Sequence, residues 1–277
     1  MVFELPIPIT NHICLVGDPI QDVYRYGNIV NLRFYQTSAR IKPGGVLNVF
    51  SNLQAILPTK KIDYLAKIDP SKVLRLNRLI DKDSENCIIE FYAQHVPHVD
   101  MKRYYKQLMT WPELQSFPRF NLLIADYDKG TVNNSQRLVA GWNSTKIDLA
   151  IVDSRYRSFN HKIIQHAKCK IWRCTGNEYD KTWANNFDIV IHTNGPEAIQ
   201  MLFKNNPNNK ITIPPLNQID AIDTCGAGDT FTAAIMAYLT NKELINQKNL
   251  VEACKFAQLC AADVVQKKLT ATTTITL

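Results

Sequence analysis

The sequence predicts an α/β fold built on a mostly parallel sheet that is covered on both faces. Four short apolar runs, each closed by a polar or acidic residue, carry this prediction: ICLVGD (13–18), NLLIAD (121–126), IDLAIVD (147–153) and FDIVIHT (187–193). Segments with helical spacing lie between them. Strands that read as continuous apolar runs and alternate with helices are typical of a parallel sheet buried on both faces.

The residues that close these runs indicate where a ligand would bind. In open parallel sheets, ligands bind outside the carboxyl ends of the strands. Asp18, Asp126, Asp153 and Thr193 all fall at such ends. We therefore expect the functional site along that edge of the sheet.

Local signals place three helices. Asp69-Pro70 offers an N-cap followed by a proline at the first helical position, which predicts a helix to about Ile80. A second helix follows a glycine pair, because an apolar stripe repeats at helical spacing: Val46, Val49, Phe50, Leu53 and Ile56. A third is predicted after residue 228 by the repeat of Phe231, Ala234, Ile235, Tyr238 and Leu239.

Two β-rich segments, 31–41 and 86–96, interrupt the alternation of strands and helices. We expect them to form a small accessory sheet, or lid, from about 28–43 and 86–100. No linker, repeat or low-complexity tract divides the chain. The sequence therefore predicts a single domain over residues 1–277, with the lid as an excursion from it.

Composition narrows the class of protein. The seven cysteines are odd in number and none is spaced as CxxC, which favours reduced thiols in a cytoplasm over disulfides or a zinc site. No segment resembles a signal peptide or a membrane span. The formal charge of +7 is spread along the chain, so we expect a solvated surface or an anionic small substrate, with no nucleic acid or membrane as partner.

The stretch DTCGAGDT (223–230) is the most informative motif. Glycines at 226 and 228 let backbone N–H groups approach a ligand, and a helix that begins there adds unpaired donors and the positive end of its dipole. Asp229 would repel a bound phosphate but suits a general base that takes a proton from a hydroxyl. The alternative is that Asp223 or Asp229 merely caps the helix. The pattern does not match a P-loop, and Phe231 stands where a dinucleotide fingerprint needs its third glycine.

Several segments of the chain resemble motifs of a known family. DTCGAGDTFTAAIMAYL (223–239) looks like the C-terminal motif of the ribokinase-like (PfkB) carbohydrate kinases, and GGVLNVFSNLQAI (44–56) looks like their glycine-pair motif. LVGDPIQDVYRYG (15–27), ADYDKG (125–130) and AADVVQKKLTATTTI (261–275) resemble the heptose-phosphate kinase branch, which includes the kinase domain of the bifunctional ADP-heptose biosynthesis enzyme. The resemblance implies a three-layer αβα sandwich, a β lid, and ATP-dependent phosphorylation of a sugar hydroxyl with Mg²⁺.

The resemblance also implies roles for individual residues. Asp229 would be the base, and the N–H groups of Gly226, Ala227 and Gly228 would form the anion hole. The sugar would lie against four residues: Asp22, Gly44, Gly45 and Asn48. Carboxylate and amide groups suit sugar hydroxyls, and paired glycines let the ring approach the backbone. For Asn48 the alternative is a helix cap or a solvated helix face.

On the nucleotide side, Thr193 and Gly195 fall where the family places a Thr and a Gly near the ATP phosphates. Asp223 and Thr224 of the glycine motif are expected to bind the nucleotide as well. The alternative for Thr193 and Gly195 is a simple turn. Glu178 matches the glutamate of the family's Asn-x-x-Glu element and would help to hold Mg²⁺. The sequence departs from the family there, because Thr175 stands in the place of the asparagine.

A phosphate already present on the sugar would require cations of its own. The candidates are Arg40, Lys42, Lys129, Arg155 and Arg157. Lys129 belongs to the DYDKG motif, and Arg155 stands where heptose kinases carry the lysine of Asp-Pro-Lys. Each of these side chains could also be an ordinary surface cation.

Three functional hypotheses follow from these features. The first is an ATP-dependent kinase for a sugar or sugar phosphate, with a heptose 7-phosphate-like acceptor. The second is a ribokinase-like kinase for a neutral sugar or a nucleoside, and the third is a degenerate family member that binds a sugar phosphate or a partner without catalysis. Pairing of two lids into a homodimer is a further expectation.

Overall fold

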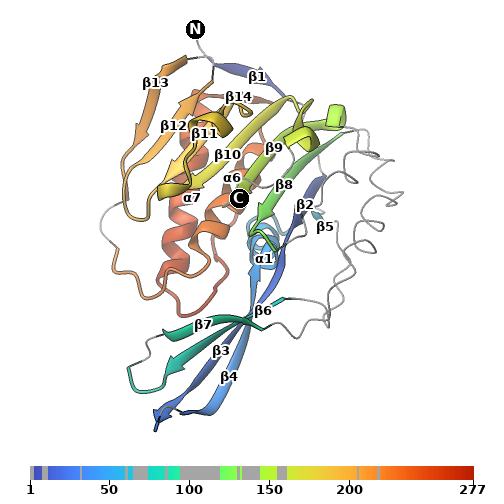
Figure 1. Cartoon of the computed structure of the whole chain (residues 1–277). Helices are drawn as coiled ribbons and strands as arrows, with labels where there is room; N and C mark the ends of the chain where they lie inside the picture. The colour runs from blue at the N-terminus through green and yellow to red at the C-terminus, as the bar shows by residue number, and fades with distance from the viewer. Residues whose placement is uncertain are drawn as a thin grey trace.

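The computed structural model describes residues 3–7, 12–31, 33–59, 62–64, 74–84, 87–93, 119–129, 132, 144–154, 161–204, 206–216 and 219–277. Figure 1 shows a central sheet with helices α1, α6 and α7 beside it and a second sheet at one end. The fold thus has the α/β architecture that the sequence predicts.

The central sheet has eight strands in the order β13-β12-β11-β10-β9-β8-β2-β5. Their bounds are Ile13–Gly17 (β2), Ile62–Tyr64 (β5), Phe120–Asp126 (β8), Ile147–Ser154 (β9), Cys169–Thr175 (β10), Ile189–Thr193 (β11), Ile199–Phe203 (β12) and Asn206–Ile213 (β13). Strands β5, β2 and β8 to β11 run parallel, whereas β12 pairs antiparallel with both β11 and β13. The four predicted apolar runs correspond to β2, β8, β9 and β11.

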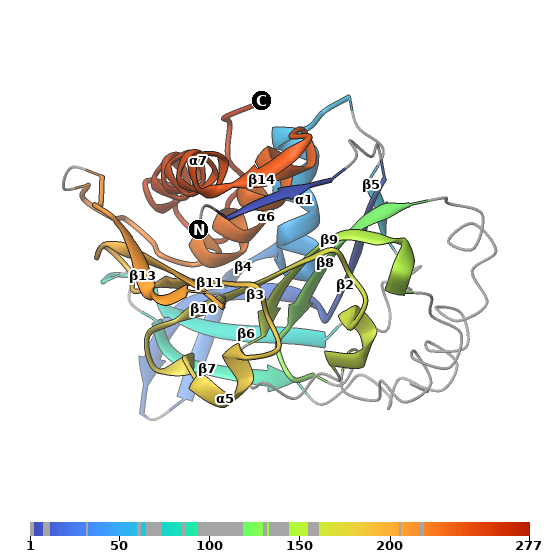
Figure 2. The same cartoon turned by 90° about the horizontal axis from the view of Figure 1, so that it is seen from above.

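In the described part of the chain, the three long helices lie on one face of this sheet (Figure 2). On one face lie α1 (Val46–Ile56), α6 (Ala227–Thr240) and α7 (Gln247–Val265). The other face is packed by α5 (Lys181–Ala184) and the 3-10 turn η3 (His161–Ile164) around the buried Trp172. Two further 3-10 turns span Ser144–Lys146 (η2) and Gly176–Glu178 (η4), and β1 (Glu4–Pro6) pairs with β14 (Leu244–Asn246).

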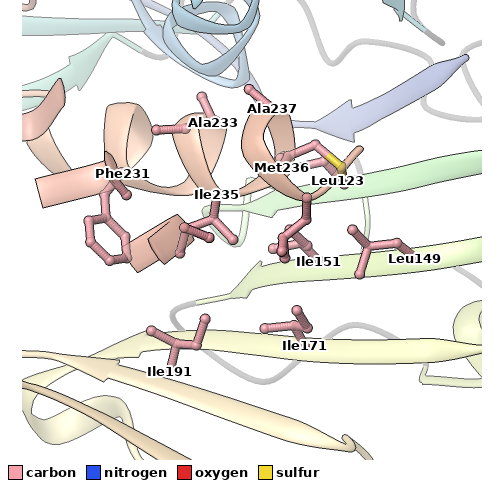
Figure 3. Close-up of a cluster of buried hydrophobic side chains, with 14 of the residues drawn as sticks. Leu123, Leu149, Ile151, Ile171, Ile191, Phe231, Ala233, Ile235, Met236 and Ala237 are labelled. Atoms are coloured by element: carbon pink, nitrogen blue, oxygen red, sulfur yellow. The ribbon is translucent and has the colours of Figure 1, made fainter. Parts of the chain in front are cut away.

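Helix α6 lies over the middle of the sheet. Figure 3 shows Phe231 and Ile235 directed toward the strands, where Ile151 and Ile171 meet them. Phe231 and Ile235 of the predicted apolar repeat therefore pack on the sheet, whereas Tyr238 contacts Glu252 and Phe256 on α7. Because removal of apolar surface from water is the main favourable term in folding, this contact holds the N-terminus of α6 against the carboxyl ends of the strands.

The second sheet has four strands in the order β4-β3-β6-β7, with bounds Pro19–Val30 (β3), Arg33–Gly45 (β4), Leu74–Asp81 (β6) and Cys87–Ala93 (β7). Strand β2 leads into β3 through Asp18, so this sheet begins at the carboxyl end of β2. The expected lid segment 28–43 lies in the β3–β4 hairpin, and part of 86–100 lies in β7. The sheet also includes residues 19–27 and 74–81, which we did not expect, and residues 94–100 lie outside the described part of the chain.

The predicted helix from Asp69 to about Ile80 is wrong in its second half, because Leu74–Asp81 is strand β6. Leu76 and Ile80 are both buried, and residues four apart share one face of a strand as well as one face of a helix. Their spacing therefore cannot distinguish the two structures. The segment forms a strand because its backbone pairs with β3 and β7. Residues 65–73 lie outside the described part.

All seven cysteines have free thiols, and most are buried as small apolar side chains. Among the described residues, no helix is long and apolar enough to cross a membrane.

Candidate active site

The glycine motif forms the N-terminus of α6, at the carboxyl edge of the sheet. Gly226 precedes the helix with a φ of 83°, a left-handed conformation that suits glycine. Within the described residues, the amides of Gly226 and Gly228 have no hydrogen-bond partner, whereas the Ala227 amide donates to the Thr224 carbonyl at 3.3 Å. Unpaired N–H groups at a helix N-terminus form an anion-binding site.

Asp229 lies in the first turn of α6 and is 9% exposed. The Asn48 side-chain amide donates to Asp229 Oδ2 at 3.0 Å, and the Tyr127 hydroxyl donates to Asp229 Oδ1. Neither donor is the backbone of the helix itself. The hydrogen bonds therefore orient the Asp229 carboxylate toward residues of other elements, and no side chain caps this helix.

Asn48 and Asn52 are fully buried on α1. Asn52 Nδ2 donates to Asn48 Oδ1 at 3.1 Å, and Asn52 Oδ1 accepts from the Thr273 amide at 2.9 Å. The solvated-face alternative for Asn48 is therefore wrong. The helix-cap alternative is also wrong, because Gly45 is the N-cap of α1.

The glycine pair permits close packing around Asp22. Gly45 has a φ of 54°, and a Cβ there would stand 2.6 Å from the Asp18 carbonyl oxygen. A Cβ on Gly44 would stand 2.7 Å from Asp22 Oδ1. The structure thus brings Asp22, Gly44 and Gly45 together. Burial raises the pKa of Asp22, although ion pairing with Arg78 opposes the shift.

Arg78, on β6, also belongs to the cluster around Asp22 and was not among the predicted residues. Its Nη1 lies 3.1 Å from Asp22 Oδ1 and donates to the Tyr24 hydroxyl at 3.3 Å. Its Nη2 lies 3.3 Å from Glu90 Oε1. The sequence predicts a helix over this segment, and a helix gives no reason to place Arg78 near Asp22. Pairing of β6 with β3 brings the two side chains together.

The C-terminal segment also reaches this cluster. The Thr270 hydroxyl donates to Asp22 Oδ2, and the Thr270 amide donates to the Tyr24 hydroxyl at 3.0 Å. Asp223 ties the same segment to the glycine motif, because Asp223 Oδ2 accepts from the Leu269 amide at 2.9 Å and Oδ1 accepts from the Cys225 amide at 2.9 Å. Asp223 thus braces the loop, while the neighbouring Thr224 is exposed.

The expected nucleotide residues lie at the end of β11. Thr193 is 8% exposed, and its hydroxyl accepts from Arg173 Nη2 at 3.1 Å. Gly195 follows in an exposed turn with a φ of 54°, and no atom lies within 4 Å of a Cβ built there. Gly195 therefore allows the turn and leaves open space beside it. Arg173 was not among the predicted residues.

Glu178 ends the 3-10 turn η4, and its Oε2 accepts from the Thr175 amide at 2.7 Å. Thr175 and Glu178 form a reciprocal capping box. A threonine in place of the family's asparagine thus has a local structural reason. No group of three or more potential metal ligands occurs among the described residues, but Mg²⁺ on a nucleotide needs few carboxylates, so the remaining oxygen of Glu178 fits such a role.

Three of the five expected phosphate cations lie in the described part of the chain, Arg40 and Lys42 on β4 and Lys129 after β8. Lys129 has an exposed side chain, and its amide donates to Asp18 Oδ2 at 3.1 Å. Arg40 is exposed, with its guanidinium 5.9 Å from the Tyr26 ring centroid. Lys42 is opposite Asp22 in the β3–β4 ladder. Arg155 and Arg157 lie outside the described residues.

A second carboxylate group lies beside the site. Asp126, at the end of β8, is buried, and burial raises its pKa to about 6, aided by repulsion from Asp18. Its oxygens accept from the Asp128 amide at 3.0 Å and from the Ser154 hydroxyl at 2.9 Å. Asp126 and Asp18 thus anchor the loop that carries Tyr127 to Asp229.

The chain is similar to known proteins in sequence over part of its length and in fold over nearly all of it. Residues 180–277 match the model of the pfkB family of carbohydrate kinases. Fructokinase-2 of Zea mays is 28% identical over 88 residues, which are 31% of this chain and 25% of the maize protein. The chain thus spans about a quarter of that relative's length.

Solved structures match over nearly the whole chain. The nucleoside kinase of Methanocaldococcus jannaschii has a TM-score of 0.67 at 17% identity and covers 96% of this chain and 95% of its own. The ribokinase of Thermotoga maritima has a TM-score of 0.65 at 18% identity and covers 95% and 96%. At these identities the similarity establishes the ribokinase fold.

We expect the free energy of unfolding to fall as pH rises from about 4 to about 6, because the buried Asp126 carboxyl has a pKa of about 6 against 3.8 in its unperturbed state. The folded state binds the Asp126 proton more tightly than the unfolded state does. The protonated carboxyl therefore stabilises the fold at low pH, and this stabilisation is lost as pH rises. Asp126→Asn should remove the part of this loss that Asp126 causes, whereas the part from Asp22, whose pKa is also raised, should remain. Urea unfolding at several pH values measures it.

Asp81→Asn is the matched control for this measurement. Hydrogen bonds from Ser84 lower the pKa of Asp81, so its contribution to stability runs in the opposite direction and is lost as pH falls. If Asp126→Asn and the wild-type protein showed the same pH dependence, burial of the Asp126 charge would not be the cause.

Proposed function

We propose that this protein, which has the ribokinase fold and carries a segment of the pfkB carbohydrate kinase family, transfers the γ-phosphoryl group of ATP to a hydroxyl of a sugar or nucleoside. One observation carries the proposal. Asp229 lies at the N-terminus of α6, between unpaired backbone amides and the fully buried Asn48 that orients its carboxylate. A helix cap alone would not need the second element, α1.

The reaction uses the two parts of this arrangement together. The acceptor hydroxyl gives its proton to Asp229 while its oxygen forms a bond to the γ-phosphorus, and the bond from that phosphorus to the β–γ bridging oxygen breaks. ADP leaves with the bridging oxygen. The amides of Gly226 and Gly228 stabilise the charge on the transferring group. The acceptor hydroxyl replaces the Tyr127 hydroxyl at Asp229 Oδ1.

Mg²⁺ is the second requirement of such a reaction. When bound, it would neutralise charge on the nucleotide phosphates. One oxygen of Glu178 caps the 3-10 turn, and the other is available to the ion or to a water that it carries. Thr193 and Gly195, at the end of β11, would lie beside the phosphates.

The identity of the acceptor is a narrower proposal. A heptose 7-phosphate-like sugar is the first choice, because two cations, Lys42 and Arg78, come from strands that flank Asp22. A neutral sugar or nucleoside is the alternative, since Arg78 is already paired with Asp22 and Glu90. A non-catalytic binding protein is a weaker candidate, because binding alone does not require the oriented carboxylate of Asp229.

The second sheet suggests a second copy of the chain as partner. Large apolar side chains are exposed on its strands: Ile29, Val30, Tyr35, Ile41, Ile88 and Ile89. Ile41 pairs with Val23, and Ile89 is aligned with Arg25 through Leu79, so Ile41 and Ile89 lie on one face of the sheet. Exposed apolar groups on one face commonly mark an interface. We propose that two such sheets pair in a homodimer, and that the protein, with its free thiols, works in the reducing cytoplasm.

Replacement of Asp229 by Asn should lower kcat for ADP release by about 10²–10⁴-fold, because the amide cannot accept the proton. Nucleotide affinity should change little, since the backbone donors remain. The measurement is coupled ADP release with ATP and Mg²⁺, beside calorimetric ATP binding. Asp220→Asn, an exposed position in the loop that leads to the motif, is the control. Full activity of Asp229→Asn would remove this residue from the mechanism.

A panel of neutral sugars, nucleosides and sugar phosphates should separate the acceptor classes. If the acceptor is a sugar phosphate, only phosphorylated acceptors turn over, and Lys42→Gln raises their KM because it removes a cation from the sugar side. Turnover of ribose or a nucleoside, with no effect of Lys42→Gln, would favour the neutral acceptor instead.

The wild-type protein should have about twice the 31.6 kDa chain mass in solution, as measured by light scattering during size-exclusion chromatography. Ile41→Lys should shift it to the monomer, because a charge would then be buried in the interface. Leu259→Lys, on the exposed side of α7, should leave the mass unchanged. If the wild-type protein were a monomer at every concentration, the proposal that two second sheets pair in a homodimer would be wrong.

A further inference from the structure

Arg173 is a buried arginine at the carboxyl end of β10, where it is 8% exposed. Its Nη1 donates to Asp153 Oδ2 at 3.1 Å, on the neighbouring strand β9. Its Nη2 donates to Thr193 Oγ1 at 3.1 Å, on the neighbouring strand β11. The guanidinium is therefore held at the edge of the sheet by residues from both sides.

The same guanidinium lies against the glycine motif. A Cβ built on Gly228 would stand 3.2 Å from both Nη1 and Nη2 of Arg173, and the Phe231 ring centroid lies 5.9 Å from its Cζ. A side chain at position 228 would thus require the guanidinium to shift by a few tenths of an ångström. Glycine at this position brings a permanent positive charge next to the unpaired amide of Gly228.

Structural stability alone does not account for this arrangement. A guanidinium has five N–H donors, and its Nε is buried without a hydrogen-bond partner among the described residues. A buried ion pair is often no better for stability than apolar side chains of the same volume, and an unsatisfied buried donor is unfavourable. The remaining donors instead suit a ligand with several acceptor oxygens.

We propose that Arg173 is a further catalytic residue, which contacts the γ-phosphoryl group of the nucleotide and completes the anion hole with a side chain. This inference rests on the proposed kinase function. Arginine stays charged and can bind two phosphate oxygens at once. Asp153 fixes its orientation, so the charge is already in position before the nucleotide binds.

Arg173 acts on charge and takes part in no proton transfer. As the bond between the γ-phosphorus and the bridging oxygen lengthens, negative charge on the nucleotide shifts, and the guanidinium stabilises it from the β10 side. The proton of the acceptor still passes to Asp229. The contribution complements that of Mg²⁺, for which Glu178 has only one carboxylate oxygen outside its capping box.

The test compares Arg173→Gln and Arg173→Lys with the wild-type protein. Arg173→Gln should lower kcat by roughly 10²-fold or more while the KM for the acceptor stays within about twofold, and Arg173→Lys should recover part of the loss because it keeps the charge. Calorimetric titration should show that Arg173→Gln weakens binding of ATP more than binding of ADP. A purely structural role would weaken both equally.

Arg119→Gln is the matched control, because Arg119 pairs with the buried Asp148 at the opposite end of the sheet. It should leave kcat and the ratio of ATP to ADP affinity unchanged. A wild-type kcat and affinity ratio in Arg173→Gln would overturn the inference. If Arg173→Gln does not fold, Arg173→Lys decides, since a wild-type kcat in a variant without the planar guanidinium is equally contrary.

Failure of the proposed function would be a separate result. If the wild-type protein phosphorylates no acceptor on the panel, the kinase proposal fails. The ATP and ADP titrations still decide the role of Arg173, because they require only nucleotide binding. An ATP affinity in Arg173→Gln that falls no more than the ADP affinity then excludes a contact with the γ-phosphoryl group.

Discussion

The hydrogen bond from Asn48 to Asp229 is the contact on which the rest of the site depends. It joins α1 to α6, two helices that are far apart in the chain, and it fixes the carboxylate beside the unpaired amides of the α6 N-terminus. A Cβ on Gly226 would stand 2.5 Å from Asn48 Nδ2, so the approach of the two helices requires glycine there. The buried pair Asn52 and Thr273 holds Asn48 in turn.

The C-terminal segment connects this contact to the second sheet. Thr270 bonds to Asp22 and Tyr24 on β3, and Leu269 bonds to Asp223 in the loop before α6. A change in the position of the second sheet therefore acts on the same loop that supplies the backbone donors. This arrangement gives the proposed kinase a physical link between the acceptor side of the site and the phosphate side.

The parts of the candidate site that depend on local chemistry could be proposed from the sequence. Gly226 and Asp229 were candidates because a helix start with bare backbone and a carboxylate suits an anion hole beside a general base. Arg78 was missed because the local signals favoured a helix where pairing with β3 makes a strand. Arg173 was missed because no motif surrounds it, and its partners Asp153 and Thr193 come from neighbouring strands.

The sequence by itself determined the α/β class, the strand ends that carry the site and the glycine loop, because apolar periodicity and backbone permissiveness are properties of adjacent residues. Only the tertiary structure decided which polar side chains meet. The pairs Asn48 with Asp229, Asp22 with Arg78, and Arg173 with Asp153 each join residues from different elements. The packing of helices on the sheet and the order of the strands bring these pairs together. No pattern within one segment indicates which residues of another segment will lie close to it.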